Sequence, residues 1–232
     1  MGLIAFVRRT PCAVLLATQL VGVLLYPYLD DSFVGRQIFA VFGLVVLALT
    51  ILAVRATPLL SWVAGLLALP ALVLLVVQVS TGNEDLAPWA SGFEAALYVY
   101  AAAAMLIYML DDEEVTTDEL FAIGAVFTLL AWAFAHIFVV VQALHPGSFT
   151  AAVNPDADRT WTELLFLSFT TLSSTGLSDV VPIAGHARSV VMIEQVAGLF
   201  YIAMVVTRLV SLNAARRLNT RTEPTTPDQP GG

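Results

Sequence analysis

Long apolar runs separated by short polar breaks dominate the chain. A helix that crosses the ~30 Å hydrocarbon core of a bilayer needs about 20 apolar residues. Runs of about this length lie at 11–29, 37–54, 58–79, 91–110, 119–144 and 187–213. The pattern therefore predicts an all-α membrane protein with six transmembrane helices.

A shorter apolar segment, Trp161–Leu172, follows a stretch rich in Gly, Pro, Asn and Asp. At ~1.5 Å per residue it extends only ~18 Å as a helix, which is too short to cross the bilayer. Small hydroxyl residues and one Gly come next. Non-helical backbone at membrane depth is tolerated where protein buries it or water lines it, and such backbone can direct carbonyl oxygens at a cation. We therefore predict a re-entrant helix over Trp161–Leu172, followed by a filter loop.

Composition supports this reading. The chain of 232 residues is 59% hydrophobic and only 12% charged, which excludes a water-soluble fold. Its net charge is -8 and every basic residue is Arg, so no basic face is available for nucleic acid. The single cysteine, Cys12, lies in the first apolar run, which argues against a disulfide framework or a cysteine-ligated metal.

The placement of Arg predicts the orientation. The first run is too long for the core of a secretory signal and lacks a small-residue cleavage site, so we expect it to be a retained span. With six spans, the side that holds both termini receives seven Arg residues and the opposite side three. These seven are Arg8, Arg9, Arg55, Arg208, Arg216, Arg217 and Arg221. The positive-inside rule then predicts a multi-pass protein of the plasma membrane with both termini in the cytoplasm.

The loop after the short helix carries a recognisable pattern. Ser168–Leu172 reads S-F-T-T-L and Ser174–Asp179 reads S-T-G-L-S-D. This resembles the pore loop of the potassium-channel superfamily, in which a run such as S-F-T-T-L-T precedes the filter T-x-G-Y-G-D. The agreement continues at Pro182, Arg188 and Gly198, and the resemblance covers about residues 119–213.

The resemblance implies a homotetramer in membrane lipid that passes K⁺ and uses no organic cofactor. It implies that the filter consists of Ser174, Thr175, Gly176, Leu177 and Ser178, of which the first four would hold the permeant cation. It implies that the filter is supported by Asp179, Trp161, Thr170, Thr171 and Glu194. In the family, Gly198 would be the hinge of the inner helix, although close helix packing explains a small residue equally well.

Three departures from the family pattern bear on ion preference. Ser174 replaces Thr but keeps the hydroxyl group, and Leu177 replaces the Tyr that ties the filter to its surroundings. Ser178 replaces the second Gly, where a left-handed conformation would cost about 1–2 kcal/mol. A non-selective monovalent cation channel, which would also pass Na⁺, is therefore the alternative to a K⁺ channel.

The same reasoning divides the chain into four parts. Residues 1–110 are expected to form a sensor-like bundle of four helices, 111–118 an acidic cytoplasmic link, 119–213 the pore domain and 214–232 a disordered cytoplasmic tail. The fourth run, 91–110, contains no Arg, so the bundle should not sense voltage. Its one charge, Glu94, is interpreted as a solvated residue near the membrane surface.

Several polar residues keep two interpretations. The acidic link could hold a divalent ion, but Asp118 also suits an ordinary helix start. Glu194 could lie behind the filter against the short helix or face the ion path, and His136 is expected to be a packed residue. Around the outer mouth, the acidic groups that could attract cations are Asp156, Asp158 and Glu163.

Two other functional classes are weaker. An intramembrane serine protease needs a Ser with a base in hydrogen-bond reach, and Ser174, Ser178 and His186 lie near a Gly. A filter explains these serines better, so we do not expect an enzyme. A secondary transporter is disfavoured because the chain shows no inverted repeat.

Overall fold

The computed structural model describes residues 10–29, 42–43, 45–46, 48–50, 58–111 and 117–222. Most of the predicted second span, 37–54, and residues 112–116 of the acidic link lie outside these ranges. Five long helices are described, α2 (Pro11–Leu29), α4 (Pro58–Thr81), α5 (Ala87–Asp111), α6 (Thr117–Leu144) and α8 (Gly185–Thr222). The shorter elements are η1 (Glu84–Leu86), α7 (Trp161–Leu172), β1 (Phe149–Thr150) and β2 (Val181–Pro182).

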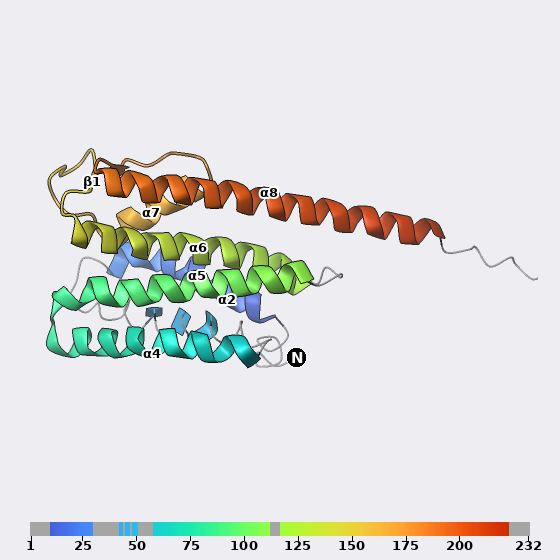
Figure 1. Ribbon diagram of the computed structural model, residues 1–232, viewed down its shortest axis with the longest axis horizontal. Helices are drawn as coiled ribbons and strands as arrows, with labels where there is room; N and C mark the ends of the chain where they lie inside the picture. Colours follow the sequence, from blue (N-terminus) through green and yellow to red (C-terminus); the bar gives the residue numbers. More distant parts are fainter. Residues whose placement is uncertain are drawn as a thin grey trace, which may run out of the picture.

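The long helices lie side by side, and α7 is a short helix between α6 and α8 (Figure 1). The two strands pair antiparallel, Phe149 opposite Pro182, at the end of the bundle where α6 stops and α8 starts. The start of α2 and the end of α8 both lie at the other end (Figure 1). This arrangement confirms a mostly helical membrane protein, in which the 12-residue α7 is shorter than a bilayer-spanning helix.

Three described helices are long and apolar enough to span a bilayer. Their spanning parts are Ala87–Ile107 in α5, Leu120–Leu144 in α6 and Gly185–Val210 in α8. The apolar parts of α2 and α4, Pro11–Leu25 and Trp62–Gln78, are shorter. Of the six predicted spans, three therefore correspond to described helices that are long and apolar enough to cross a bilayer. Two more correspond to the shorter apolar helices α2 and α4.

Two helix boundaries differ from the prediction. The fourth predicted span begins at Ala87 rather than at 91, because Pro88 fits the first turn of a helix, where no N–H bond is lost. The last helix continues nine residues beyond Asn213 to Thr222. Residues 214–222 are therefore helical, not part of a disordered tail, because their Ala, Arg and Leu are strong helix formers and the next Pro is Pro224.

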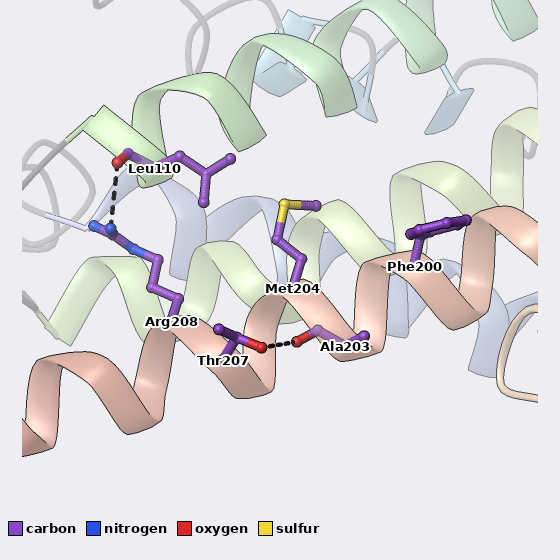
Figure 2. Close-up of a pocket in the computed structure, with 6 residues that line it drawn as sticks. All are labelled: Leu110, Phe200, Ala203, Met204, Thr207 and Arg208. Carbon is purple, nitrogen blue, oxygen red and sulfur yellow. Dashed lines mark hydrogen bonds between the residues drawn. The ribbon is translucent and has the colours of Figure 1, made fainter.

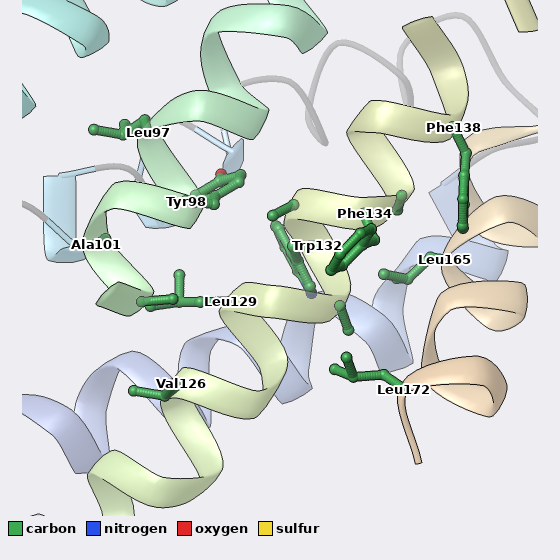
Figure 3. Close-up of a cluster of buried hydrophobic side chains, with 14 of the residues drawn as sticks. Leu97, Tyr98, Ala101, Val126, Leu129, Trp132, Phe134, Phe138, Leu165 and Leu172 are labelled. Carbon is green, nitrogen blue, oxygen red and sulfur yellow. The ribbon is translucent and has the colours of Figure 1, made fainter. Parts of the chain in front are cut away.

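The core lies where α5, α6 and α7 meet (Figure 3). Trp132 of α6 is fully buried and contacts Tyr98 of α5 and Trp161 of α7 edge to face, with ring centroids 6.0 and 5.2 Å apart. Such aromatic pairs add to the gain from burying their area. Helix α6 also packs against α2 and α8, so it is the central helix against which the others position α7.

Helix α2 is fixed to α6 at both its start and its middle. The Asp118 Oδ1 atom accepts hydrogen bonds from the backbone N–H groups of Cys12 and Ala13, at 3.2 and 3.4 Å. These N–H groups belong to the first turn of α2, which has no intrahelical acceptors for them. Further along, the hydroxyl of Thr128 donates to Gln19 Oε1 at 2.9 Å in a buried position. The two helices therefore run in the same direction, and Asp118 caps a helix other than its own.

Candidate functional site

The start of α7 is fixed by a capping box. The Thr160 hydroxyl accepts from the N–H of Glu163 at 3.3 Å, and the Glu163 carboxylate accepts from the N–H of Thr160 at 2.7 Å. This reciprocal pair satisfies two backbone donors that the first turn would otherwise leave open. The helix therefore begins at Trp161, as the sequence predicts.

Arg159 organises the loop that leads into α7, a role that was not predicted from the sequence. Its side chain is almost fully buried, and the guanidinium donates to the carbonyl groups of Val153, Asn154 and Ala157. Its own backbone N–H and C=O groups bond to the side chain of Gln142 at 2.9 and 3.0 Å. An Arg directly before a capping Thr is the only sequence signal that could have pointed to this residue.

Replacing Thr160 with Ala tests how much the capping box contributes. The substitution removes the acceptor for the Glu163 N–H, and loss of an N-cap side chain costs about 1 kcal/mol. We expect a lower thermal unfolding temperature of the purified protein in detergent. Thr207→Ala is the control, because Thr207 is exposed and, among the described residues, its hydroxyl bonds within its own helix, to Ala203 O. Equal unfolding temperatures for the two variants would contradict a capping role.

The chain turns back on the end of α7 immediately after Leu172. The carbonyl oxygen of Thr170 accepts from the N–H groups of Thr175 and Gly176, both at 3.0 Å, and from the Thr175 hydroxyl at 3.2 Å. Thr175 Oγ1 also lies 2.8 Å from Ser173 Oγ. These bonds fasten the first half of the predicted filter to the C-terminal end of the short helix.

Left-handed backbone occurs at different filter positions from the one expected. Gly176 has φ +65°, which Gly adopts without cost. Ser174 has φ +59°, and a non-Gly residue pays about 1–2 kcal/mol there. Ser178, where the comparison with the family pattern placed this strain, has no positive φ, and its hydroxyl instead accepts from the Val180 N–H at 3.1 Å. The Ser that replaces the second Gly of the pattern is thus accommodated by a local hydrogen bond.

The loop predicted to be the filter is exposed in the single chain. The side chains from Ser174 to Leu177 are exposed, and Leu177 is 78% exposed, whereas Thr170 and Thr171 just before them are buried. Asp179 is exposed too, and its carboxylate makes no hydrogen bond or ion pair with the described part of the chain. The predicted support from Asp179 is therefore not seen among the described residues. Thr170 bonds to the loop, whereas Trp161, at the other end of α7, packs against Trp132 and His136, so its support of the filter stays a prediction.

Glu194 of α8 lies behind α7. It is fully buried, and its Oε1 atom accepts a hydrogen bond from the Ser168 hydroxyl. Ser168 Oγ is also 2.9 Å from the carbonyl oxygen of Ala131 in α6. Of the two positions that the sequence left open for Glu194, the structure has the one against the short helix. One side-chain contact thus joins α6, α7 and α8.

Gly198 is the point at which α8 touches the end of α7. A Cβ atom built at Gly198 would lie 2.1 Å from the carbonyl oxygen of Leu172 and 2.8 Å from its carbonyl carbon. Only Gly permits this approach of two backbones, which is the usual reason for small residues in membrane helices. The geometry accounts for Gly198 as a packing residue, and α8 continues as a helix through it. A hinge at Gly198 stays a prediction.

Glu94 and His136 form an intramembrane pair that the sequence analysis missed. His136 Nδ1 lies 3.2 Å from Glu94 Oε2, with side chains 11% and 14% exposed, so Glu94 is not the solvated surface residue that was expected. The His136 ring packs against Tyr98 and Trp161, at centroid distances of 5.7 and 5.6 Å. Glu94 and Tyr98 are four residues apart on α5, so they lie on one face of that helix, and Trp132 and His136 share a face of α6 in the same way. This spacing is the sequence signal that could have suggested a polar and aromatic contact between the two helices.

A shallow, mostly apolar pocket of about 410 Å³ separates α8 from the end of α5 (Figure 2). Its lining residues are Leu110, Phe200, Ala203, Met204, Thr207 and Arg208. Arg208 reaches across it and donates to the carbonyl oxygen of Leu110 at 3.3 Å (Figure 2). This bond links the fourth predicted span to the part of α8 beyond the filter.

Comparison with known proteins agrees with this geometry. A family model described as "Ion channel" matches residues 96–214, just over half of the chain. The matched region holds the second part of α5, all of α6 and α7, the filter loop, and α8 as far as residue 214. No curated protein and no solved structure matches the chain.

Proposed function

Because the chain belongs to the ion channel family whose model covers residues 96–214, we propose that four copies form a K⁺-conducting pore around the loop 174–178. Membership of this family makes the protein a multi-pass membrane channel and not the intramembrane protease considered above. Each subunit would contribute six spans, the described helices α2, α4, α5, α6 and α8 together with the run 37–54. No organic cofactor is needed for passive ion flow.

The observation that carries the proposal is that the loop 174–178 is hydrogen-bonded to the end of α7 while most of its side chains are exposed. The end of α7 is fixed by Glu194 and Gly198, and Thr170 bonds to the loop from behind, but Ser174–Leu177 face outward without cover. One loop cannot surround an ion, whereas a ring of loops related by a symmetry axis can. The carbonyl oxygens of Thr175, Gly176 and Leu177, with the Ser174 hydroxyl, would then replace the water around K⁺.

The exposed face of α8 supports assembly around an axis. Only 22% of its spanning segment is buried in one chain, against 61% for α6. Its large, more than half-exposed apolar side chains are Met192, Ile193, Val196, Leu199, Phe200, Val206 and Val210. In a tetramer this face would line the inner cavity and contact the neighbouring subunits, and the remaining apolar surface would face lipid.

The direction of α7 favours cations. The helix ends at Leu172, next to the filter, and the C-terminal end of a helix carries about half a negative charge. Four such ends would stabilise a cation near the axis. The fourth span lacks Arg, so we propose a pore that does not sense voltage through this helix. The Arg distribution, with the start of α2 and the end of α8 at one end of the bundle, supports cytoplasmic termini.

Purified protein in a planar bilayer between unequal K⁺ and Na⁺ solutions tests the proposal. We expect a cation current in the wild type and none in Gly176→Val, because a branched side chain opposes the φ of +65°. Absence of current in reconstituted, tetrameric wild-type protein, or unchanged current in Gly176→Val, would reject the assigned filter.

The double variant Leu177→Tyr/Ser178→Gly tests selectivity. It restores the family pattern at the two outer positions, so we expect its reversal potential to lie closer to the K⁺ equilibrium potential than that of the wild type. Leu66→Tyr on α4 is the matched control, because Leu66 is 60% exposed and distant in sequence from the filter. If the wild type passes Na⁺ as readily as K⁺, the non-selective alternative is correct. If the double variant has the same reversal potential as the wild type, positions 177 and 178 do not set selectivity.

A further inference from the structure

Two histidines stack at the end of the bundle where α6 stops and α8 starts. His145 is the residue after α6, and His186 is the second residue of α8. Their ring centroids are 4.2 Å apart and the ring planes differ by 13°. Both residues are exposed, and they are the only histidines besides His136, which is buried. The channel function proposed above gives this pair no role.

A hydrogen-bonded frame holds the two histidines together. The Ser148 carbonyl oxygen accepts from the N–H groups of Ile183 and Ala184, at 2.9 and 3.3 Å, and the Ser148 hydroxyl donates to the His145 carbonyl oxygen. The pairing of β1 with β2 continues this frame. Each histidine is within three residues of a frame residue, so the two rings are brought together by the backbone before any ligand arrives.

Two neighbouring imidazoles are the chemistry that divalent transition metals prefer. Zn²⁺ binds His nitrogen at about 2.0–2.1 Å, and two ligands at a tetrahedral angle then lie about 3.4 Å apart. A metal lies in the plane of each imidazole that binds it, so the stacked rings, whose centroids are 4.2 Å apart, must turn about their side-chain torsions before two nitrogens point at one ion. Both side chains are exposed, which leaves room for that turn. We propose that His145 and His186 bind a divalent ion of the Zn²⁺, Ni²⁺ or Cu²⁺ class, which joins the end of α6 to the start of α8.

Water would complete the coordination. The described residues hold no group of three His, Cys, Asp or Glu side chains placed to share a metal, so the site has two protein ligands. The net charge of -8 favours cations near the chain. Of the Arg residues near this end, Arg159 is buried and bonds to carbonyl groups, and Arg188 donates through Nε to the Pro182 carbonyl oxygen at 3.2 Å.

The test uses untagged, full-length protein in detergent, titrated with Ni²⁺ by calorimetry. We expect one ion per subunit, and at least a tenfold weaker affinity in His145→Ala and in His186→Ala. Val153→Ala, a change at a 69% exposed residue in the loop between α6 and α7, should bind as the wild type does. With Cu²⁺, electron paramagnetic resonance should show two nitrogen ligands in the wild type and one in each single variant.

Stability provides a second readout that does not depend on ion conduction. Because a metal that binds only the folded state stabilises it, Ni²⁺ should raise the unfolding temperature of the wild type. The double variant His145→Ala/His186→Ala should show no such rise. Equal affinity and equal thermal shifts in the wild type and the double variant would overturn the metal site while leaving the proposed channel function untouched.

Discussion

Replacing Gly198 with Ala is expected to dislodge the end of α7 and to abolish a stable, conducting protein. The added Cβ would lie 2.1 Å from the Leu172 carbonyl oxygen, and that atom is backbone, so no flexible side chain can move aside. Overpacking of this kind typically costs about 1–3 kcal/mol and sometimes more. We expect a clearly lower unfolding temperature in detergent, loss of the assembled species in gel filtration, and loss of bilayer current.

Gly65→Ala is the matched control, since nothing lies within 4 Å of a Cβ built at Gly65 in α4. There the change should be neutral or slightly stabilising, because Ala is favoured over Gly in a helix by about 1 kcal/mol. The same pair of variants separates packing from a hinge. A hinge predicts a Gly198→Ala protein that folds and assembles normally but opens differently. Normal unfolding and assembly would therefore refute the packing role.

Removal of the Ser168 hydroxyl is expected to destabilise the protein more than removal of both partners of its contact. In Ser168→Ala the Glu194 carboxyl group keeps its buried place but loses the hydrogen bond to its Oε1 atom. Its Oε2 atom already has no hydrogen-bond partner among the described residues. Leaving a buried polar group unsatisfied costs about 1–3 kcal/mol.

The double variant Ser168→Ala/Glu194→Leu removes that unsatisfied group and fills the space with an apolar side chain of similar size. We expect it to unfold at a higher temperature than Ser168→Ala alone, because apolar replacement of a buried polar pair is often neutral or stabilising. Tyr201→Phe is the control on the same helix, since it removes only the hydrogen bond to the Ile123 carbonyl oxygen. A double variant less stable than the single variant would show that Glu194 is held by other contacts.

The short helix was predictable from sequence because its limits are set locally. Thr160 and Glu163 mark its start by their spacing, and the Ser and Gly residues after Leu172 mark its end. The helices α2 and α6 were found for a similar reason, since each is a continuous apolar run with polar flanks. The end of α8 was missed because the last span was ended where its apolar run stops at Asn213, although the Ala, Arg and Leu residues that follow are good helix formers.

The supporting contacts were not predictable because they join residues far apart in the chain. Nothing local to Glu194 distinguishes a residue behind the filter from one that faces the ions, and only the packing of α8 on α7 decides. The same holds for Glu94, whose neighbour His136 comes from the next helix. The conformation of the predicted filter depends in turn on the Thr170 carbonyl group, and no sequence pattern identifies that group as the acceptor for the N–H groups of Thr175 and Gly176.

The hydrogen bonds from the start of α2 to Asp118 determine which helices of the chain must move together. Sequence order suggests a peripheral unit of four spans joined to a pore by an acidic connection. In the structure, the start of α2 is hydrogen-bonded to Asp118 at the start of α6, and α5 packs on the same helix. Any displacement of the start of α6 would therefore move α2 as well. A shortened protein that begins at the acidic connection would lose the helix that packs along α6, so α2 is better regarded as part of the support of α6 than as part of a separate unit.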